Sequence, residues 1–141
     1  MTELGHNITC IEPAEKPAEK ARLKGLNVCK TRLQDYHINK KFDCIVAISS
    51  LIHIPRSEMP LQIQKLSQLI KREGIIFLSF IEGDCEGCED PTRKGRERFF
   101  SKFTQDELNA MLSPHFSFLE VHRIDVKKMN QSFLLTVLKP L

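Results

Sequence analysis

The sequence predicts an α/β fold with a mostly parallel sheet, helices on both faces and an antiparallel hairpin at its C-terminal end. Two nearly continuous apolar runs, residues 42–48 and 75–80, are typical of central parallel strands covered on both faces. The segment between them carries apolar residues at spacings of four, three and four, which is one face of a helix. Two further apolar segments near the end, joined by a short connection, favour a hairpin. These patterns predict strands and helices in alternation along a single domain, residues 1–141.

The first expected elements are short. Residues 7–11 form an apolar run that ends at Glu12 and is expected to be a strand. Residues 14–23 carry small or apolar side chains at helical spacing, and Gly25 supplies a stop signal. Residues 26–29 are a less marked strand candidate.

The later elements have clearer signals. A helix is expected over residues 59–70, with Gly74 ending its connection to the next strand. Thr104 and Glu107 have the spacing of a capping box ahead of a third helix. Residues 116–121 and 132–138 are the two strands of the hairpin, joined through residues 125–130.

Composition and charge exclude several classes of protein. Of the 141 residues, 41% are hydrophobic and 28% charged, which is enough apolar material for a core and is not typical of disorder. No apolar run approaches the roughly 18 residues of a membrane span. A net charge of +3 is too small to favour nucleic acid as the main ligand, because acidic residues offset the basic stretch at 93–98. We therefore expect neither a membrane nor a nucleic-acid partner.

The five cysteines indicate a reducing compartment. Their number is odd, no secretion signal is visible, and two of them lie in apolar runs, so free thiols in the cytoplasm are expected. Cys85 and Cys88 form a CxxC motif, but a zinc site needs four ligands and no second motif supplies them. Glycines and acidic residues surround the pair, which favours loop cysteines over a redox or metal site. No metal site is predicted.

Residues at the ends of the expected strands are the candidates for function, because ligands of such sheets bind beyond the carboxyl ends of the strands. A carboxylate at Glu12 could accept hydrogen bonds from two ribose hydroxyls, or it could be a solvated acid at the start of a helix. His53 could be a general base, a hydrogen-bond partner of a substrate, or a residue that packs a loop. Both sets of alternatives stay open on position alone.

One expected feature of a nucleotide site is missing. A ribose-binding acid normally follows a glycine-rich loop by about 20 residues. Only eleven residues precede Glu12, and Gly5 is the only glycine among them. A first strand with a glycine-rich loop does not fit into this length.

Four segments nevertheless resemble one family. They are IEP at 11–13, FDCIVAISSLIHIP at 42–55, LIKREGIIFLSFIEGD at 69–84 and FFSKFTQDEL at 99–108. In this order they resemble the small class I S-adenosylmethionine-dependent methyltransferases, over nearly the whole chain. The resemblance implies a Rossmann-like fold, S-adenosylmethionine as cofactor, and transfer of its methyl group to a small-molecule acceptor. Such transfer can depend largely on proximity and orientation.

The resemblance also implies roles for single residues. Glu12 matches the acid that holds the cofactor ribose, and Arg32 with Leu33 lies where the family contacts the adenine edge. An arginine at position 32 departs from the family's usual acidic residue. Ala47 and Ser49 match the segment that lines the methionine end of the cofactor. His53 matches a histidine that is frequent in that segment, and we expect it to have a catalytic role. Glu82, Phe99 and Phe100 would face the acceptor pocket.

The resemblance starts after the family's first strand and glycine-rich loop. We therefore expect a truncated or split methyltransferase whose neighbouring strands have open edges, covered by a second copy or by an upstream complementing segment. The alternative is a non-catalytic binding module of the same fold that dimerises. A fragment of a nicotinamide-dependent dehydrogenase gains no support from residues 49–55.

Overall fold

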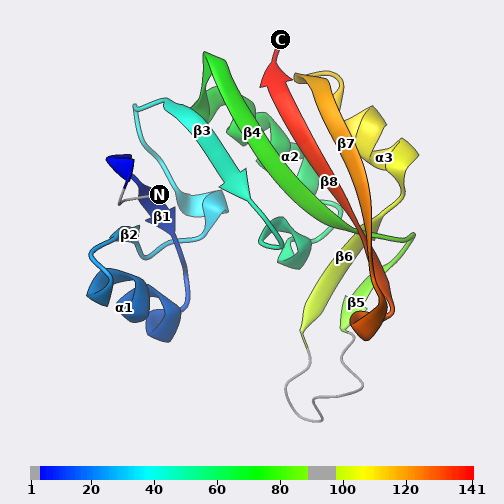
Figure 1. Cartoon of the computed structure of the whole chain (residues 1–141), viewed down its shortest axis with the longest axis horizontal. Coiled ribbons are helices and arrows are strands. Elements are labelled where there is room, and N and C mark those ends of the chain that lie inside the picture. The colour runs from blue at the N-terminus through cyan, green and yellow to red at the C-terminus, as the bar shows by residue number, and fades with distance from the viewer. Residues whose placement is uncertain (1–3, 89–97) are drawn as a thin grey trace. The chain divides into compact units, whose positions relative to one another are not determined.

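A computed structural model of the protein describes residues 4–88 and 98–141 (Figure 1). Its internal contacts divide the chain into two compact units, Met1–Asn39 and Lys40–Leu141. Each unit has its own sheet and is described by itself.

The first unit is a small βαβ arrangement. It contains β1 (Thr9–Ile11), α1 (Glu15–Leu23), β2 (Asn27–Cys29) and the 3₁₀ helix η2 (Leu33–Asp35). β1 and β2 are parallel, with Thr9 opposite Asn27 and Ile11 opposite Cys29, so α1 is the crossover between them. The strand expected at residues 26–29 is confirmed. Ala18 is the buried residue of α1.

The second unit contains most of the secondary structure. Its elements are β3 (Phe42–Ala47), η3 (Leu51–His53), α2 (Met59–Leu69), β4 (Ile70–Glu82), β5 (Glu86–Cys88), β6 (Phe99–Phe103), α3 (Gln105–Leu112), β7 (Phe116–Val126), η4 (Lys127–Met129) and β8 (Gln131–Pro140). The two strands expected from apolar runs, the helix between them, the third helix and the hairpin are all present.

β4 is the strand on which the second sheet is built. It pairs in parallel with β3, in antiparallel orientation with β8, and in parallel with β6 at its carboxyl end. β7 and β8 form the antiparallel hairpin expected at the C-terminal end. Their turn ends at Asn130, which has a φ of 49°, a left-handed conformation that asparagine tolerates better than most residues.

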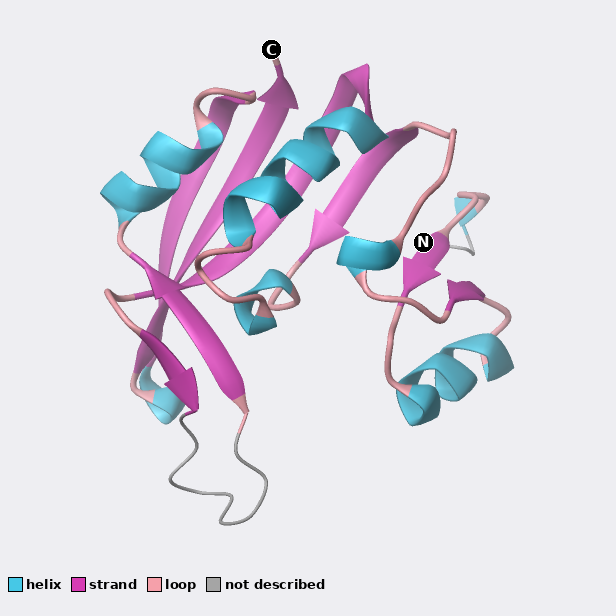
Figure 2. Ribbon diagram, turned by 180° about the vertical axis from the view of Figure 1, so that it is seen from behind, coloured by secondary structure: helices cyan, strands magenta, loops and turns pink. Residues whose placement is uncertain are grey.

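Helices cover one face of this second sheet. α2 and α3 lie on the same side of it in Figure 2. β8 shows the consequence, because Leu134, Thr136 and Leu138 are buried while the residues between them are partly exposed. This alternation is the mark of a strand with one covered face.

Two features differ from the expected elements. β4 begins at Ile70, directly after α2, so Gly74 lies inside a strand and does not end a connection. A Cβ at Gly74 would lie 2.7 Å from the Ile70 side chain and 2.9 Å from the Asp43 carbonyl oxygen, so the close approach of β3 requires glycine. The short strands β5 and β6 pair with each other and were not predicted.

The structure describes four of the five cysteine thiols and a small part of the basic stretch. Cys10, Cys29, Cys44 and Cys85 are free. The Cys88 side chain and most of the basic stretch at 93–98 lie outside the described residues. Within the described part of the chain, no helix is long and apolar enough to cross a membrane.

Candidate functional site

Glu12 follows β1 directly and contacts the start of α1. Its Oε1 atom accepts a hydrogen bond from the Ala14 backbone N–H at 2.8 Å. Its own N–H donates to the Cys29 carbonyl, which fixes the residue to the end of β2. One carboxylate oxygen is thus used at the helix start, and the other forms no hydrogen bond within residues 4–88 and 98–141. The carboxylate can still accept a hydrogen bond from a ligand hydroxyl.

Arg32 and Leu33 lie at the start of η2 in the same unit. The Arg32 Nε donates to the Asp35 carboxylate at 2.9 Å, in an exposed ion pair. Position 32 has an arginine in place of an acid, so it has no carboxylate that could accept a hydrogen bond from the adenine amino group. Leu33 is half-buried and offers an apolar surface.

In the second unit, the chain turns sharply where β3 ends. Ala47 is buried, and Ser49 has a φ of 51°, which costs a residue with a side chain roughly 1–2 kcal/mol. The Ser49 N–H donates to the Ser79 hydroxyl at 2.8 Å, and Ser79 is buried in β4. Such strained backbone positions are often found at ligand sites.

His53 meets two of the residues expected at the acceptor pocket. Its Nδ1 atom lies 2.8 Å from the Phe99 carbonyl oxygen. The centroids of the His53 and Phe100 rings are 5.0 Å apart, with 46° between the ring planes. The structure thus brings His53 next to two predicted site residues, Phe99 and Phe100, that lie more than 40 positions further along the chain.

The segment that follows His53 is held along β6. The buried Ser101 hydroxyl donates to the Ile54 carbonyl at 2.7 Å. The Arg56 guanidinium donates to the Lys102 carbonyl and pairs with Glu107, and it lies over the Phe103 ring at 4.8 Å. These contacts fix the position of residues 53–56 relative to β6.

Glu82 is occupied by a different network at the end of β4. It accepts a hydrogen bond from the Arg123 Nε at 2.7 Å. Arg123 also donates to Asp125 at 2.7 Å and to Ser132 at 3.0 Å. The bond to Glu82, together with the nearby Asp125, raises the pKa of Arg123. The Glu82 side chain is thus bound to β7.

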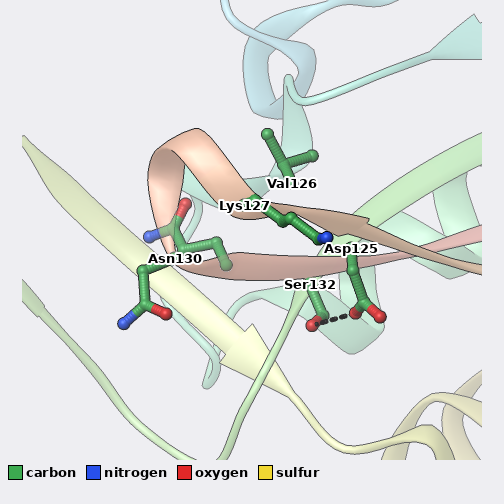
Figure 3. A pocket seen from close by; sticks show the side chains of 6 residues that line it. Asp125, Val126, Lys127, Asn130 and Ser132 are labelled. Atoms are coloured by element: carbon green, nitrogen blue, oxygen red, sulfur yellow. Dashed lines mark hydrogen bonds between the residues drawn. The ribbon is translucent and has the colours of Figure 1, made fainter.

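A shallow pocket of about 200 Å³ lies at the β7–β8 turn (Figure 3). It contains none of the residues predicted for the site. Its lining residues are Asp125, Val126, Lys127, Asn130, Gln131 and Ser132. The bond from Ser132 to Asp125, 2.7 Å long, closes part of it.

Three supporting residues were missed at the sequence level. Ser79 and Ser101 each interrupt an apolar strand, and both prove to be buried and hydrogen-bonded to the segment after β3. A polar residue inside an apolar strand is the signal that could have found them, because buried hydroxyls need partners. Arg56 had no comparable signal.

Comparisons with known proteins identify the fold. No protein-family model matches the sequence, and no curated protein matches it. Solved structures do match. One is 1,6-didemethyltoxoflavin-N1-methyltransferase from Burkholderia thailandensis, solved with 1,6-didemethyltoxoflavin and S-adenosylhomocysteine bound, at 19% identity and a TM-score of 0.78. The match covers 99% of this chain and 63% of that one.

Two further matches support the same conclusion. An S-adenosylmethionine-dependent methyltransferase from Clostridium acetobutylicum has a TM-score of 0.70 at 14% identity, over 95% of this chain and 75% of that one. The magnesium protoporphyrin IX methyltransferase from Synechocystis, solved with S-adenosylmethionine bound, has a TM-score of 0.70 at 18% identity, over 97% of this chain and 61% of that one. The chain has the Rossmann-like fold of the S-adenosylmethionine-dependent methyltransferases.

Proposed function

We propose that the chain serves S-adenosylmethionine-dependent methyl transfer to a small-molecule acceptor. The observation that carries the proposal is the cluster of His53, Phe99 and Phe100 beyond the carboxyl end of β3, in a fold shared with methyltransferases solved with this cofactor. Ligands of open α/β sheets bind at this end of the strands.

Taken unit by unit, residues of the chain suit separate parts of the cofactor, with one departure in the first unit. Bound S-adenosylmethionine would supply an electrophilic methyl group on a sulfonium. The free carboxylate oxygen of Glu12 would accept a ribose hydroxyl, and Leu33 would contact the adenine. Ala47 and the strained turn at Ser49 would face the methionine end. Arg32 is the departure, since its guanidinium is paired with Asp35.

The acceptor would bind beside β6. Phe99 and Phe100 are half-buried and offer aromatic surface, and His53 is exposed beside them. Glu82 would act on the acceptor only after release from Arg123, so we place it at the edge of the pocket.

Calorimetric titration with S-adenosylmethionine and S-adenosylhomocysteine tests the proposal. Calorimetry is suited to this chain because it has no tryptophan and one tyrosine. We expect micromolar binding that is lost in Glu12→Ala. Glu19→Ala is the matched control, because this exposed acid belongs to α1 and does not directly follow β1. Absence of binding at millimolar cofactor would overturn the proposal for this chain.

A second candidate is a non-catalytic module that pairs through a sheet edge, and β3 favours it. Among the described residues, β4 is the only strand that pairs with β3, so the other edge of β3 has no partner. Val46 is 53% exposed and Ile48 50% exposed on or next to this strand. Exposed apolar edge strands tend to pair with another chain.

Light scattering over a wide concentration range tests this alternative. A dimer that dissociates in Val46→Lys, but not in Leu61→Lys on the exposed face of α2, would support it. A stable monomer at every concentration would rule out pairing between copies. If the Val46→Lys variant still binds the cofactor, cofactor binding does not depend on pairing through β3, and the two candidate functions can be judged separately.

We also propose a reducing, cytoplasmic environment. The four thiols whose state is described are free, and two of them, Cys44 and Cys85, are exposed to solvent. Exposed free thiols persist where glutathione and thioredoxin keep them reduced.

A further inference from the structure

The hydrogen bond between His53 and Phe99 determines which ring nitrogen carries the proton. A carbonyl oxygen can only accept a hydrogen bond, so the Nδ1 atom, 2.8 Å from the Phe99 oxygen, must be the donor. In the neutral ring the lone pair then lies on Nε2. No described residue forms a hydrogen bond with Nε2.

The acceptor of this bond belongs to an ordered strand. Phe99 begins β6 and is paired with Cys88 of β5. Two residues further along β6, the Ser101 hydroxyl holds the Ile54 carbonyl at 2.7 Å, next to His53 in the sequence. Ser101 is fully buried, so this bond is shielded from competing water. β6 therefore holds both the backbone beside His53 and the ring itself.

The surroundings of the His53 ring limit the kind of ligand that can bind beside it. His53 is exposed, so a proton that it accepts can pass to water. Phe100 packs against one side of the ring at 5.0 Å, and Phe99 and Phe100 are both half-buried. Aromatic side chains of this kind favour a flat, apolar ligand.

We propose that β6 fixes His53 as the Nδ1–H tautomer, with Ser101 as a positioning residue, so that Nε2 takes a proton from the methyl acceptor. This inference rests on the proposed function. The acceptor oxygen or nitrogen gains the methyl carbon and its bond to hydrogen breaks. The proton goes to Nε2, and the electron pair of the broken carbon–sulfur bond stays on sulfur. The acceptor class is therefore a planar molecule with a hydroxyl or N–H nucleophile.

Nitrogen-15 NMR of the full chain tests the tautomer without any assay of activity. The chain has five histidines, and the signal missing from the His53→Gln spectrum identifies the ring. Above the titration range of histidine, we expect the His53 Nε2 resonance at the position of an unprotonated nitrogen. A spectrum in which Nε2 carries the proton would overturn the inference.

The role of Ser101 has its own comparison. In Ser101→Ala we expect the His53 tautomer population to shift toward Nε2–H, because the Ile54 carbonyl loses its partner and the segment moves. Ser101→Thr keeps a hydroxyl and should restore the Nδ1–H form. Ser57→Ala, an exposed serine of the same segment, is the control. An unchanged tautomer in a folded Ser101→Ala chain would remove Ser101 from the proposal.

A probe pair tests the acceptor class. Phenol carries a hydroxyl on a flat ring, and benzene is the matched ring without it. We expect only phenol to shift the His53 Nε2 resonance, whereas equal effects of both probes would overturn the assignment of a protic acceptor. Cofactor binding without the Nδ1–H tautomer would refute this inference alone. The Nδ1–H tautomer without cofactor binding would refute the proposed function alone.

Discussion

At the scale of single residues, side chains of β4 and β6 hold the segment that follows β3. Ser79 accepts the Ser49 N–H, Ser101 donates to the Ile54 carbonyl, and the Phe99 carbonyl accepts from His53. Each of these bonds uses a group that would otherwise be buried without a partner or left to water. A site held by such supporting contacts keeps its geometry when a ligand arrives.

Thr104→Ala is expected to weaken the start of α3. The Thr104 hydroxyl accepts the Glu107 N–H at 3.2 Å, and the Glu107 carboxylate accepts the Thr104 N–H at 2.9 Å. Loss of the threonine should lower the free energy of unfolding by about 1 kcal/mol. Urea unfolding at neutral pH measures it. Ser113→Ala, at the other end of the helix and without a side-chain cap bond, is the control.

The same capping box predicts a pH dependence. The hydrogen bond from the Thr104 N–H lowers the pKa of Glu107 below its usual value, and Arg56 lowers it further by a smaller amount. A lowered folded-state pKa means that this contribution to stability is present above the unfolded pKa of glutamate, about 4.3, and is lost as the pH falls through the folded value. Stability of the natural chain and of Glu107→Gln, measured from pH 7 down to about pH 3, should converge at the acid end. Parallel curves would contradict this.

At the scale of elements, β4 holds the second unit together because three strands pair with it. β3 closely approaches the first residues of β4, and Gly74 leaves room for that approach. The register of β3 shifts between Phe42 and Cys44, at the same place. The glycine and the irregularity together let a strand begin directly after α2.

Gly74→Ala is therefore expected to destabilise the chain. The added Cβ would meet the Ile70 side chain at 2.7 Å and the Asp43 carbonyl at 2.9 Å, and the backbone oxygen cannot move without breaking the β3–β4 pairing. We expect a loss of about 1–3 kcal/mol in the free energy of unfolding. Gly74 does not have a positive φ, so contact with the added Cβ and not backbone strain is the expected cause of the loss. Unchanged stability of Gly74→Ala would contradict the steric argument.

At the scale of the whole molecule, the two units have cores of very different size. Ala18 and Tyr36 are the buried apolar residues described in Met1–Asn39, whereas the second unit buries residues such as Phe80, Leu134 and Leu138 completely or nearly so. Units of about 40 residues are marginal without added constraints.

Hydrogen exchange of the full chain should separate the units. We expect the amides of β4 and β8 to be protected most strongly and those of β1, α1 and β2 to exchange much faster, because local stability follows buried apolar contacts. Mass spectrometry of peptic fragments resolves the two regions. Protection of Met1–Asn39 equal to that of β4 would show that something outside its own core stabilises it. Cofactor added at saturation should raise protection at the end of β1 if Glu12 binds it.

Much of the fold follows from local patterns in the sequence. The apolar spacing of Met59, Ile63 and Leu66, all buried in α2, depends only on the period of a helix. The capping box at Thr104 acts within one turn, so its spacing was sufficient. The hairpin of β7 and β8 needs one short connection. In each case the interacting residues are close in the sequence.

Contacts between residues that are distant in the sequence could not be predicted and were found only in the tertiary structure. The sequence suggested His53, Phe99 and Phe100 through a family resemblance, but the bond between Nδ1 and the Phe99 carbonyl depends on β6, a strand that the pattern did not predict. Glu82 was suggested in the same way, and the structure pairs it with Arg123 on β7, 41 positions away.

Local patterns in the sequence were enough to predict the α/β class, the main strands and helices, and the candidate residues at the strand ends. The shared side of α2 and α3, the contact between His53 and Phe99 and the pairing of the acids became clear only in the folded chain. The physical reason is that helical and strand periods and caps are set by neighbours along the chain. Hydrogen bonds and ion pairs between strands depend on where the sheet brings residues that lie tens of positions apart.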